Sequence, residues 1–448
     1  MNFSEGTETM AEQKYTISDI IETYISGDWG NDEPTEDASC PVSCIRGADI
    51  VPIYNSEYNN IPLRYISEKS LSNRALQEGD IVIEKSGGSP TQSTGRVVYI
   101  SKELLEEKQD IVCSNFCAAF RIKPEWDAQY VYYYLQHVYN AGVFFNFEGK
   151  TSGLKNLIMD TAFKSITIKK IAIETQRSIA TVLSTIESKM AANRAINHYL
   201  EAMAKQLYDY WFVQFDFPDE NGKPYKSSGG KMVWNEKLKR EIPEGWSNVP
   251  LRDFADIYNG ATPSTEVSSN YGGDIIWITP KDLSDQQSKF TYYGYRNITS
   301  AGYNSCSTRL LPAKTILLSS RAPIGLISIA MVDLCTNQGF KSLVCKDLQL
   351  YAYLYYYIRH HIKQIEQLGT GTTFKEVSRE DLCTFPILEV KSTELMQQWL
   401  NQIEPIFMQQ YELIKEINYL SKKRDELLPL LMNGQVSVRQ LNNDLPVD

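Results

Sequence analysis

GKTSGLKNL (Gly149–Leu157) and GTGTTFKEV (Gly369–Val377) are two copies of one stretch of sequence. Other stretches repeat around them in the same order. GDIVIEKSGG (Gly79–Gly88) aligns with AKTILLSSRA (Ala313–Ala322), the CSNF at Cys113 with the CTNQ at Cys335, and the YVYYYLQH from Tyr130 with the YAYLYYYIRHH from Tyr351. Three of these pairs lie 220 to 222 residues apart, and the pair that begins at Gly79 and Ala313 lies 234 apart. These separations are far longer than the ~20–50 residues of solenoid repeats. The chain is therefore predicted to contain a duplicated domain.

Each copy has the pattern of a small mixed domain. Short apolar runs alternate with Gly, Pro, Asn and Ser, which is typical of strands between turns. These runs are DIVIE (Asp80–Glu84), RVVYI (Arg96–Ile100), CAAFRI (Cys117–Ile122), IIWIT (Ile275–Thr279), TILLSS (Thr315–Ser320) and LISIAMV (Leu326–Val332). Tyr130–Gly142 is predicted to be a helix that ends at Gly142 and packs its aromatic rings in the core. The predicted fold class is α+β.

A long helix is predicted after each copy, because apolar residues recur at alternating spacings of three and four. In the first helix this apolar line consists of Ile179, Val182, Ile186, Ile196, Leu200, Met203 and Leu207, and in the second of Met396, Trp399, Ile403, Ile406, Leu413, Ile417, Leu420, Leu427 and Leu431. Two such helices are expected to pair as an antiparallel coiled coil that joins two similar domains about a pseudo-twofold axis.

Polar residues interrupt both apolar lines. Lys189 and Asn193 do so in the first helix, and Gln410 and Arg424 in the second. Asn193, Gln410 and Arg424 either fix the register of the coiled coil, as buried polar groups do in some coiled coils, or lie solvated at its edge.

The predicted boundaries follow from these patterns. They are a disordered tail (1–14), the first domain (15–173), the first long helix (174–215), a connector without helical or strand periodicity (216–248), the second domain (249–391), the second long helix (392–433) and a C-terminal tail (434–448). Pro405 is expected to kink the second helix or to mark its start, since proline removes a backbone donor. Gly434 is expected to end it.

Composition narrows the class of protein. No apolar run approaches the ~18 residues of a membrane helix, and the N-terminus lacks the pattern of a secretory signal. Eight cysteines and four histidines lack zinc-ligand spacing, so reduced thiols in a cytoplasmic protein are expected. The net charge of −10 argues against binding nucleic acid alone through a broad basic face.

Several catalytic motifs are absent from the sequence. It contains no GxxxxGK[ST] phosphate-binding loop, no HExxH or GxSxG motif, and no Asn-Pro-Pro-aromatic or Asp-Pro-Pro-aromatic tetrapeptide. Scattered carboxylates leave an unrecognised hydrolase as an open, less favoured alternative.

Long stretches resemble the specificity subunits of type I restriction–modification systems. The resemblance includes Met203–Trp246, which contains FDFPDENGKPYKSSGGKMVW, then VPLRDFADIYNGATPST (Val249–Thr265), YGGDIIWITPKDLS (Tyr271–Ser284), TNQGF (Thr336–Phe340) and KKRDELLPLLMNGQVSV (Lys422–Val438). It covers nearly the whole chain, although the first domain lacks the NGxTPS and WITPKDLS strings of the second, which makes transfer of residue roles to the first domain unsafe.

The resemblance implies a function as well as a fold. It implies two target-recognition domains that each read one half of a bipartite site in double-stranded DNA, with a coiled coil that sets the gap. It implies no catalysis and no cofactor in this chain. The partners it implies are two methyltransferase subunits, which use S-adenosylmethionine, and through them restriction and translocase subunits, which use ATP and Mg; no membrane is involved.

Two kinds of loop in each domain are candidates for DNA contact, because they offer the polar and basic side chains that reach base edges and phosphates. The loops after the paired strands supply Lys85, Ser86, Ser89, Thr91, Gln92, Thr94 and Arg96 in the first domain and Ser319, Ser320 and Arg321 in the second. The glycine–threonine loops supply Lys150, Thr151, Ser152 and Lys155, and Thr370, Thr372, Thr373 and Lys375. Lys281, with Thr279 and Asp282, is a weaker candidate, while Tyr258 and Asn259 are expected to be structural. Ordinary surface turns are the alternative for all of these loops.

Two further functions fit the same pattern. One is the specificity subunit of a two-component system, in which methylation and cleavage share one partner chain. The other is a scaffold that holds proteins without reading bases.

Overall fold

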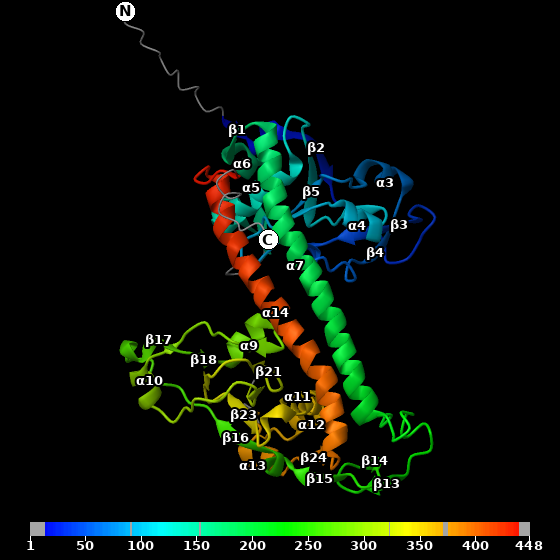
Figure 1. Ribbon diagram of the computed structural model, residues 1–448. Coiled ribbons are helices and arrows are strands. Elements are labelled where there is room, and N and C mark those ends of the chain that lie inside the picture. The colour runs from blue at the N-terminus through cyan, green and yellow to red at the C-terminus, as the bar shows by residue number, and fades with distance from the viewer. Residues whose placement is uncertain (1–13, 90–91, 152–153, 322, 371–374, 439–448) are drawn as a thin grey trace, which may run out of the picture. The chain divides into compact units, whose positions relative to one another are not determined.

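The computed structural model describes residues 14–89, 92–151, 154–321, 323–370 and 375–438. The chain divides into two compact units (Figure 1). The first unit contains residues 1–192 and 418–448, and the second contains residues 193–417. The search of the described residues for a helix long and apolar enough to cross a membrane found none. The predicted N-terminal tail lies outside the described residues apart from Lys14.

A four-stranded antiparallel sheet forms the centre of the first unit. Its order is β2 (Ile21–Ser26), β9 (Cys117–Ile122), β5 (Ile81–Glu84) and β7 (Val97–Tyr99). Ile81 and Ile83 of β5 belong to one core cluster, and Val82 between them belongs to another. Side chains alternate between the faces of a strand, so a strand covered on both faces is apolar throughout. The strands predicted around 80–84, 96–100 and 117–122 are confirmed.

Three smaller sheets complete the first unit. One has β8 (Ile111–Cys113) parallel to β3 (Cys40–Ile45), with β4 (Leu63–Ile66) on the other side; β1 (Lys14–Thr16) pairs with β12 (Thr167–Lys169). The third contains β6 (Ser86–Gly87), β10 (Glu148–Thr151) and β11 (Leu154–Leu157). The short helices are α1 (Ile17–Ile20), α2 (Ile50–Tyr54), α3 (Glu68–Arg74), α4 (Lys102–Glu107) and α6 (Met159–Ser165).

The second unit repeats this topology. Its sheet has the order β16 (Ala255–Asn259), β23 (Phe340–Cys345), β20 (Ile316–Ser319), β21 (Ile327–Ala330), with β19 (Phe290–Thr291) added at the edge. A parallel pair, β18 (Trp277–Ile278) and β22 (Cys335–Thr336), corresponds to β3 and β8, and β15 (Ser247–Pro250) with β24 (Pro386–Glu389) corresponds to β1 and β12. The predicted duplication is confirmed for the central sheet, the parallel pair and the pair formed by the first and last strands, whereas the sheet of β6, β10 and β11 has no counterpart sheet among the described residues of the second unit. The remaining elements are β17 (Tyr271–Ile275), α8 (Leu251–Phe254), α9 (Pro280–Gln286), α10 (Ser300–Asn304), α12 (Ile362–Gln367) and α13 (Arg379–Thr384).

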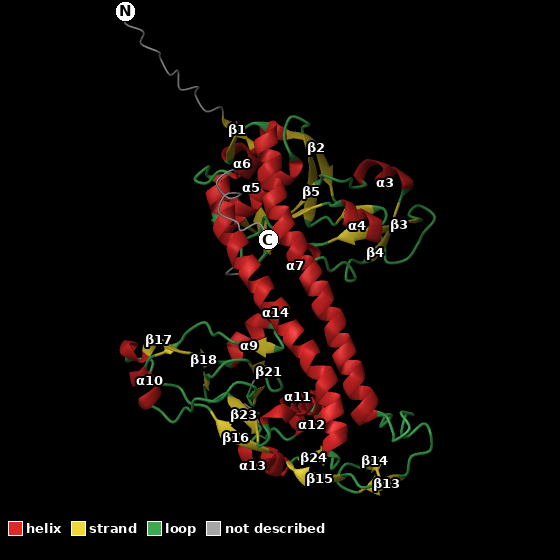
Figure 2. Ribbon diagram, viewed as in Figure 1, coloured by secondary structure: helices red, strands yellow, loops and turns green. Residues whose placement is uncertain are grey.

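An aromatic helix packs against the central sheet in each unit. It is α5 (Ala128–Asn140) in the first unit and α11 (Tyr351–His360) in the second. Tyr130, Tyr132 and Tyr133 are buried, which confirms that the rings belong to the core. Gly142 follows α5 with a φ of 71°, a left-handed conformation that favours glycine, and it ends the helix as predicted. Figure 2 shows that helices and strands are mixed in both units, so the α+β prediction is confirmed.

Two long helices, α7 (Ile173–Tyr208) and α14 (Thr393–Met432), contribute to both units. In the first unit, Leu183 near the start of α7 shares a core cluster with Leu428 and Leu431 at the end of α14. In the second unit, Tyr208 at the end of α7 packs on Trp399 near the start of α14, with ring centroids 6.4 Å apart. The start of each helix therefore contacts the end of the other, which confirms the antiparallel pairing.

The predicted apolar line of the first helix is correct at its start, where Ile179 is 4% exposed, and wrong at Ile196 and Met203. Ile196 is 43% exposed and Met203 is 55% exposed, whereas the buried residues of α7 beyond its first turns are Leu183, Met190, Asn193, Ala204 and Tyr208. Both sets have three–four spacing, so spacing alone does not choose between them. In the second unit α7 lies close to the aromatic core with Ala204 and Tyr208 inward, and this packing selects the line that contains a small residue and a polar one.

The second helix is closer to its prediction. Met396, Trp399 and Ile403 are buried as expected, and Phe407, which the prediction missed, is fully buried. α14 is continuous from Thr393, so Pro405 does not mark its start. Gly434 has a φ of 68° directly after the helix, which confirms it as the stop.

Of the three polar residues considered for fixing the register, two are buried in the second unit. Asn193 is 2% exposed and its Nδ2 donates to Glu416 at 2.8 Å. Gln410 is 1% exposed and accepts from Lys289 Nζ at 2.9 Å. These bonds fit the register-fixing alternative for Asn193 and Gln410. In the first unit Arg424 lies nearer the surface, where its guanidinium bonds to Asp425 and lies 5.2 Å from the Tyr54 ring centroid.

The connector is not structureless, which corrects the prediction. Within it, β13 (Met232–Asn235) pairs with β14 (Arg240–Pro243) in a hairpin. The π-helical turn (Asp209–Val213) that continues α7 precedes the connector and lies in the predicted first long helix. Phe217 stacks between Tyr225 and Trp246, with ring centroids 4.8 and 5.1 Å away. The connector thus has a small aromatic core of its own, which glycine and lysine content obscured in the sequence.

Candidate nucleic-acid interface

The structure brings together the two predicted loops of the first unit. The glycine–threonine stretch forms the hairpin of β10 and β11, in which Lys150 pairs with Lys155. β11 then pairs with β6, so Lys155 lies opposite Gly87 and Asn156 opposite Ser86. The Ser86 hydroxyl donates to Asn156 Oδ1. Residues far apart in the sequence therefore form one small sheet at the edge of the unit.

Glu148 organises this sheet. Its carboxylate, 7% exposed, accepts from Thr94 N at 2.7 Å and from the Thr94 hydroxyl at 3.2 Å, and lies 3.3 Å from Lys155 Nζ. Lys155 Nζ also donates to the Gln92 carbonyl at 3.2 Å. Lys155 is thus held in place, and Thr94, fully buried, supports the sheet from beneath.

Arg96 is bound by a carboxylate and does not project freely. Its Nε donates to Glu84 Oε2 at 2.8 Å and its Nη2 to Glu84 Oε1 at 2.6 Å. Glu84 is 2% exposed, and this two-point pair raises the pKa of Arg96 against the effect of burial. Because a fork of this kind is among the strongest side-chain pairs, the structure assigns Arg96 a supporting role, in place of the surface contact suggested by the sequence.

The second unit joins its two loops in the same way. Val377 N donates to the Ser320 carbonyl at 3.0 Å, as Leu157 N does to the Lys85 carbonyl at 2.7 Å in the first unit. Arg321 Nη2 and Lys341 Nζ each lie 3.0 Å from the carboxylate of Glu376. Although burial opposes it, the hydrogen bonds from Arg321 and Lys341 lower the pKa of Glu376.

Two residues of the second unit that were predicted to contact DNA are buried. Ser319 is fully buried: its hydroxyl donates to the Pro323 carbonyl at 2.7 Å and accepts from Leu326 N at 2.8 Å. Ser320 is 1% exposed and its hydroxyl donates to the Gly339 carbonyl. The prediction of a surface loop here is wrong, because β20 extends to Ser319 and the turn is closed by these hydroxyls.

The other candidates divide by position. Lys281, Thr370 and Lys375 are exposed, and Arg321 keeps half of its side chain exposed. Lys85, Ser89 and Gln92 are half-buried, and Ser89 N and Gln92 N donate to each other's carbonyls across a tight turn. The weaker candidates Thr279 and Asp282 form the capping box of α9. Thr91, Ser152, Thr372 and Thr373 lie outside the described residues, and for Lys150 and Thr151 only the strand pairing is described.

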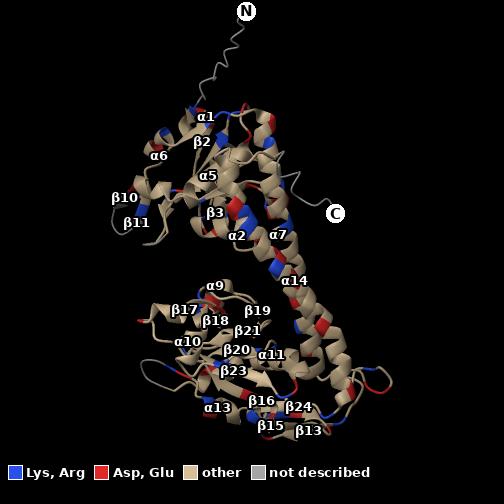
Figure 3. Ribbon diagram, turned by 60° about the vertical axis from the view of Figure 1, so that its left-hand side comes forward, with Lys and Arg blue, Asp and Glu red and all other residues tan. Residues whose placement is uncertain are grey.

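Sequence reasoning missed the residues that hold the loops together. No role was predicted for four charged residues, which are Glu84, Glu148, Glu376 and Lys341. Each of the three glutamates is ion-paired with a predicted DNA-binding residue, and Lys341 is ion-paired with Glu376. The one signal was a charge inside an apolar strand, as in DIVIE and in GFKSLVC. Figure 3 shows basic and acidic residues interspersed in both units, in keeping with the net charge of −10.

An exposed apolar face on α7 is a second candidate site. It consists of Ile196, Tyr199 and Met203, which are 43%, 68% and 55% exposed. Residues three and seven apart lie on one side of a helix, so the three form a stripe turned away from the buried side that contains Ala204 and Tyr208.

The surroundings of two buried cysteines, Cys44 and Cys117, suppress the reactivity of their thiols. All eight are free thiols. Burial raises the pKa of Cys44 to about 12 and that of Cys117 to about 11, so both stay protonated at neutral pH. Among the described residues, no group of three or more His, Cys, Asp or Glu side chains is placed to hold a metal ion.

Comparison with known proteins gives one consistent result. A sequence profile of the type I restriction modification DNA specificity domain matches residues 13–202 and 243–417. The chain is 39% identical over 158 residues to the specificity subunit of type I restriction enzyme MjaIX from Methanocaldococcus jannaschii, a match that spans 34% of this chain and 37% of that one. It is 26% identical over 316 residues to the specificity subunit of type I restriction enzyme HindI from Haemophilus influenzae, which covers 59% of this chain and 67% of that one.

A solved structure has the same fold. The crystal structure of the S subunit of a type I restriction–modification system from M. genitalium superposes with a TM-score of 0.60 at 14% identity. The superposition covers 95% of this chain and 96% of that one.

Proposed function

The chain belongs to the family of type I restriction modification DNA specificity domains, and on that premise we propose that it is the specificity subunit of a DNA methylation and restriction complex. Each unit reads one half of a bipartite site in double-stranded DNA, and the long helices set the gap between the halves. The subunit acts in the cytoplasm, together with the DNA.

The duplicated loop pair is the observation that supports this proposal most strongly. Both units close the glycine–threonine stretch onto the loop after the central strand by the same backbone bond, Leu157 N to Lys85 O in one and Val377 N to Ser320 O in the other. The two units therefore share a backbone arrangement but carry different side chains on it, as expected if they recognise different half-sites. Lys375, which is exposed beside the glycines of the second unit, supplies charge for a phosphate. Phosphate contacts fix the register on DNA, while base contacts specify the sequence.

We propose that the chain is not itself an enzyme. The sequence lacks the phosphate-binding loop and the base-binding tetrapeptides, and the buried charges of both candidate interfaces are paired with one another as supports. In this proposal S-adenosylmethionine, ATP and Mg are bound by partner subunits.

The exposed apolar face of α7 is the proposed docking site for methyltransferase. Tyr199, Ile196 and Met203 would be covered by apolar side chains of that partner, and restriction subunits would join through it. Aromatic and methionine side chains are enriched in interface cores, so this face suits a protein partner. Because the net charge of the chain is −10, we expect it to bind DNA only weakly when it is alone. A basic partner supplies the missing phosphate contacts.

Two alternatives predict different results. In a two-component system the same face would bind a single chain that both methylates and cleaves. In the scaffold alternative the partners bind but the loops do not read bases.

Sequencing of methylated bases in a genome tests the proposal. Cells that contain this chain and its cognate methyltransferase are expected to show a bipartite motif with a fixed gap that is lost when the chain is deleted. Lys375→Gln should weaken methylation at all sites, because a phosphate contact carries no sequence information, whereas the matched change Lys363→Gln, at an exposed lysine of α12, should have no effect. A complex that still assembles while no motif depends on the chain would favour the scaffold.

A further inference from the structure

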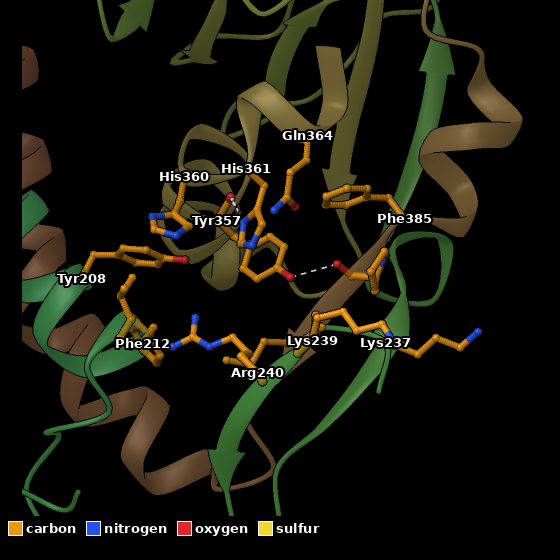
Figure 4. A pocket seen from close by; sticks show the side chains of 14 residues that line it. Tyr208, Phe212, Lys237, Lys239, Arg240, Tyr357, His360, His361, Gln364 and Phe385 are labelled. Carbon is orange, nitrogen blue, oxygen red and sulfur yellow. Dashed lines mark hydrogen bonds between the residues drawn. The ribbon is translucent and has the colours of Figure 1, made fainter. Parts of the chain in front are cut away.

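A cavity of about 170 Å³ lies in the second unit, where the connector meets the core. Its walls come from the end of α7, the turn between β13 and β14, the end of α11 with the start of α12, and β24. At ~30 Å³ per water molecule it has room for about five waters. Figure 4 shows side chains from these separate elements meeting around one space.

The polar groups that line this cavity are basic or neutral. They include Lys237, Lys239 and Arg240 from the connector and His360, His361 and Gln364 from the helices, and no Asp or Glu is among the lining residues. Lys237 and Lys239 are exposed at the rim, and Lys239 is ion-paired with Glu236. Asp209 acts on His360 but is itself ion-paired with Lys205.

Arg240 is half-buried beside this cavity without a carboxylate. Its Nη2 donates to the Val213 carbonyl, and its guanidinium lies 4.4 Å from the Phe215 ring centroid. Among the described residues it forms no ion pair, and burial lowers its pKa. Arginine has five N–H donors and stays charged, so most of its donors lack a partner within the protein.

Tyr208 has a hydroxyl with no partner. Its side chain is 2% exposed, and in Figure 4 the hydroxyl is directed to the same space as the Arg240 guanidinium. The neighbouring tyrosines are satisfied: the Tyr357 hydroxyl donates to the Pro386 carbonyl at 2.8 Å and the Tyr353 hydroxyl to the Leu388 carbonyl at 2.6 Å. Within the described part of the chain, the Tyr208 hydroxyl forms no hydrogen bond. The hydroxyl faces the cavity, so a ligand there that accepts hydrogen bonds can bind it.

From this arrangement we infer that the cavity binds a small oxyanion, and that a phosphate group fits it best. The Arg240 guanidinium and the Tyr208 hydroxyl donate to its oxygens, while His361 and Gln364 line the opposite wall. Arginine matches phosphate geometry with two parallel bonds. Lys237 and Lys239 are exposed at the rim, so the organic group of a phosphate monoester can extend past them into solvent. This inference goes beyond the proposed DNA-reading function and does not depend on it.

Calorimetric titration of the full chain with inorganic phosphate, at constant ionic strength, tests the inference. Saturable binding of one phosphate is expected. Tyr208→Phe keeps the buried ring and removes only the hydroxyl, and it should weaken binding about tenfold, the typical loss of a hydrogen bond to a charged group. Arg240→Gln should abolish measurable binding. Lys231→Gln is the matched control, because Lys231 is an exposed lysine of the same connector that does not line the cavity.

Titration with AMP separates the two sources of such a group. Binding of AMP with similar affinity means that a phosphate monoester is accepted, and exclusion of AMP means that free phosphate is the ligand. Absence of saturable binding, or equal binding by wild type and the well-folded Tyr208→Phe variant, would overturn the inference. So would binding that is lost in Lys375→Gln and kept in Tyr208→Phe, because the phosphate would then occupy the candidate DNA interface.

Discussion

The amino group of Lys289 is buried in the second unit. Its side chain is 8% exposed, and Nζ lies 2.8 Å from Glu201 Oε2, 2.9 Å from the Tyr356 hydroxyl and 3.6 Å from the Phe407 ring centroid. Burial lowers the pKa of Lys289 to about 7 despite the attraction of Glu201. Glu201 comes from α7 and Phe407 from α14, so one ammonium group ties both long helices to the domain.

Lys289→Met should therefore destabilise the second unit. Removing one partner of a buried pair typically costs ~3–5 kcal/mol, but Glu201 would keep Arg359 and Gln410 as partners. We expect a loss of about 1–3 kcal/mol in the free energy of unfolding, measured by urea denaturation. Lys415→Met, which breaks an exposed pair with Glu412, should leave the free energy of unfolding unchanged. A variant as stable as wild type would mean that apolar packing fully replaces the ion pair.

His361 should make the second unit sensitive to acid. Burial, with smaller contributions from His360 and Arg240, lowers its pKa to about 4, although the Tyr357 carbonyl at 2.9 Å favours the proton. In the unfolded chain a histidine has a pKa of ~6.5. Between pH 6.5 and 4 the unfolded state takes up a proton that the folded state does not, so stability falls as the pH falls through this window.

His361→Gln removes that contribution. The free energy of unfolding of wild type relative to the variant should decrease by roughly 1–3 kcal/mol from pH 7 to pH 4, measured by denaturation at a series of pH values in phosphate-free buffer. A difference that stays constant with pH would show that His361 is protonated equally in both states.

At the scale of elements, α7 has two faces with opposite roles. Its buried side contains Asn193, Ala204 and Tyr208, and its exposed stripe contains Ile196, Tyr199 and Met203. The stripe has the more apolar side chains, which is the reverse of an ordinary amphipathic helix. This inversion is understandable if the stripe is an interface and the inner line is constrained by aromatic packing.

Tyr199→Asp with Met203→Asp should prevent methyltransferase binding and leave folding intact. Both side chains are mostly exposed, so their loss creates no cavity, whereas a charge at an interface core must be desolvated. Co-purification and light scattering would measure assembly, with circular dichroism to check the fold. Gln398→Asp places the same charge at an exposed position of α14, outside the stripe, and should retain binding. Undiminished assembly of the double variant would exclude this face as the docking site.

At the scale of the whole molecule, the duplication makes the two readers separable. Each unit has its own central sheet, its own aromatic helix and its own closed loop pair. Exchange of residues 15–173 for those of another specificity subunit should therefore change one half of the methylated motif and leave the other half and the gap unchanged. Sequencing of methylated bases in cells with the chimaera measures this directly. A change in both halves would mean that the units do not read DNA independently.

The sequence by itself determined the duplication, the positions of the main strands, the aromatic helices and the antiparallel long helices, because each rests on local periodicity or on a repeat visible in the chain. It also singled out the stretches that contain Lys155 and Arg321 as candidates for DNA contact. Only the tertiary structure decided which line of α7 is buried, that Ser319 and Ser320 close a turn from within, and that Arg96 belongs to Glu84. Those outcomes depend on contacts between residues far apart in the chain. The two lines of α7 have the same spacing in the sequence, and they differ in burial only because the rest of the fold packs against one of them.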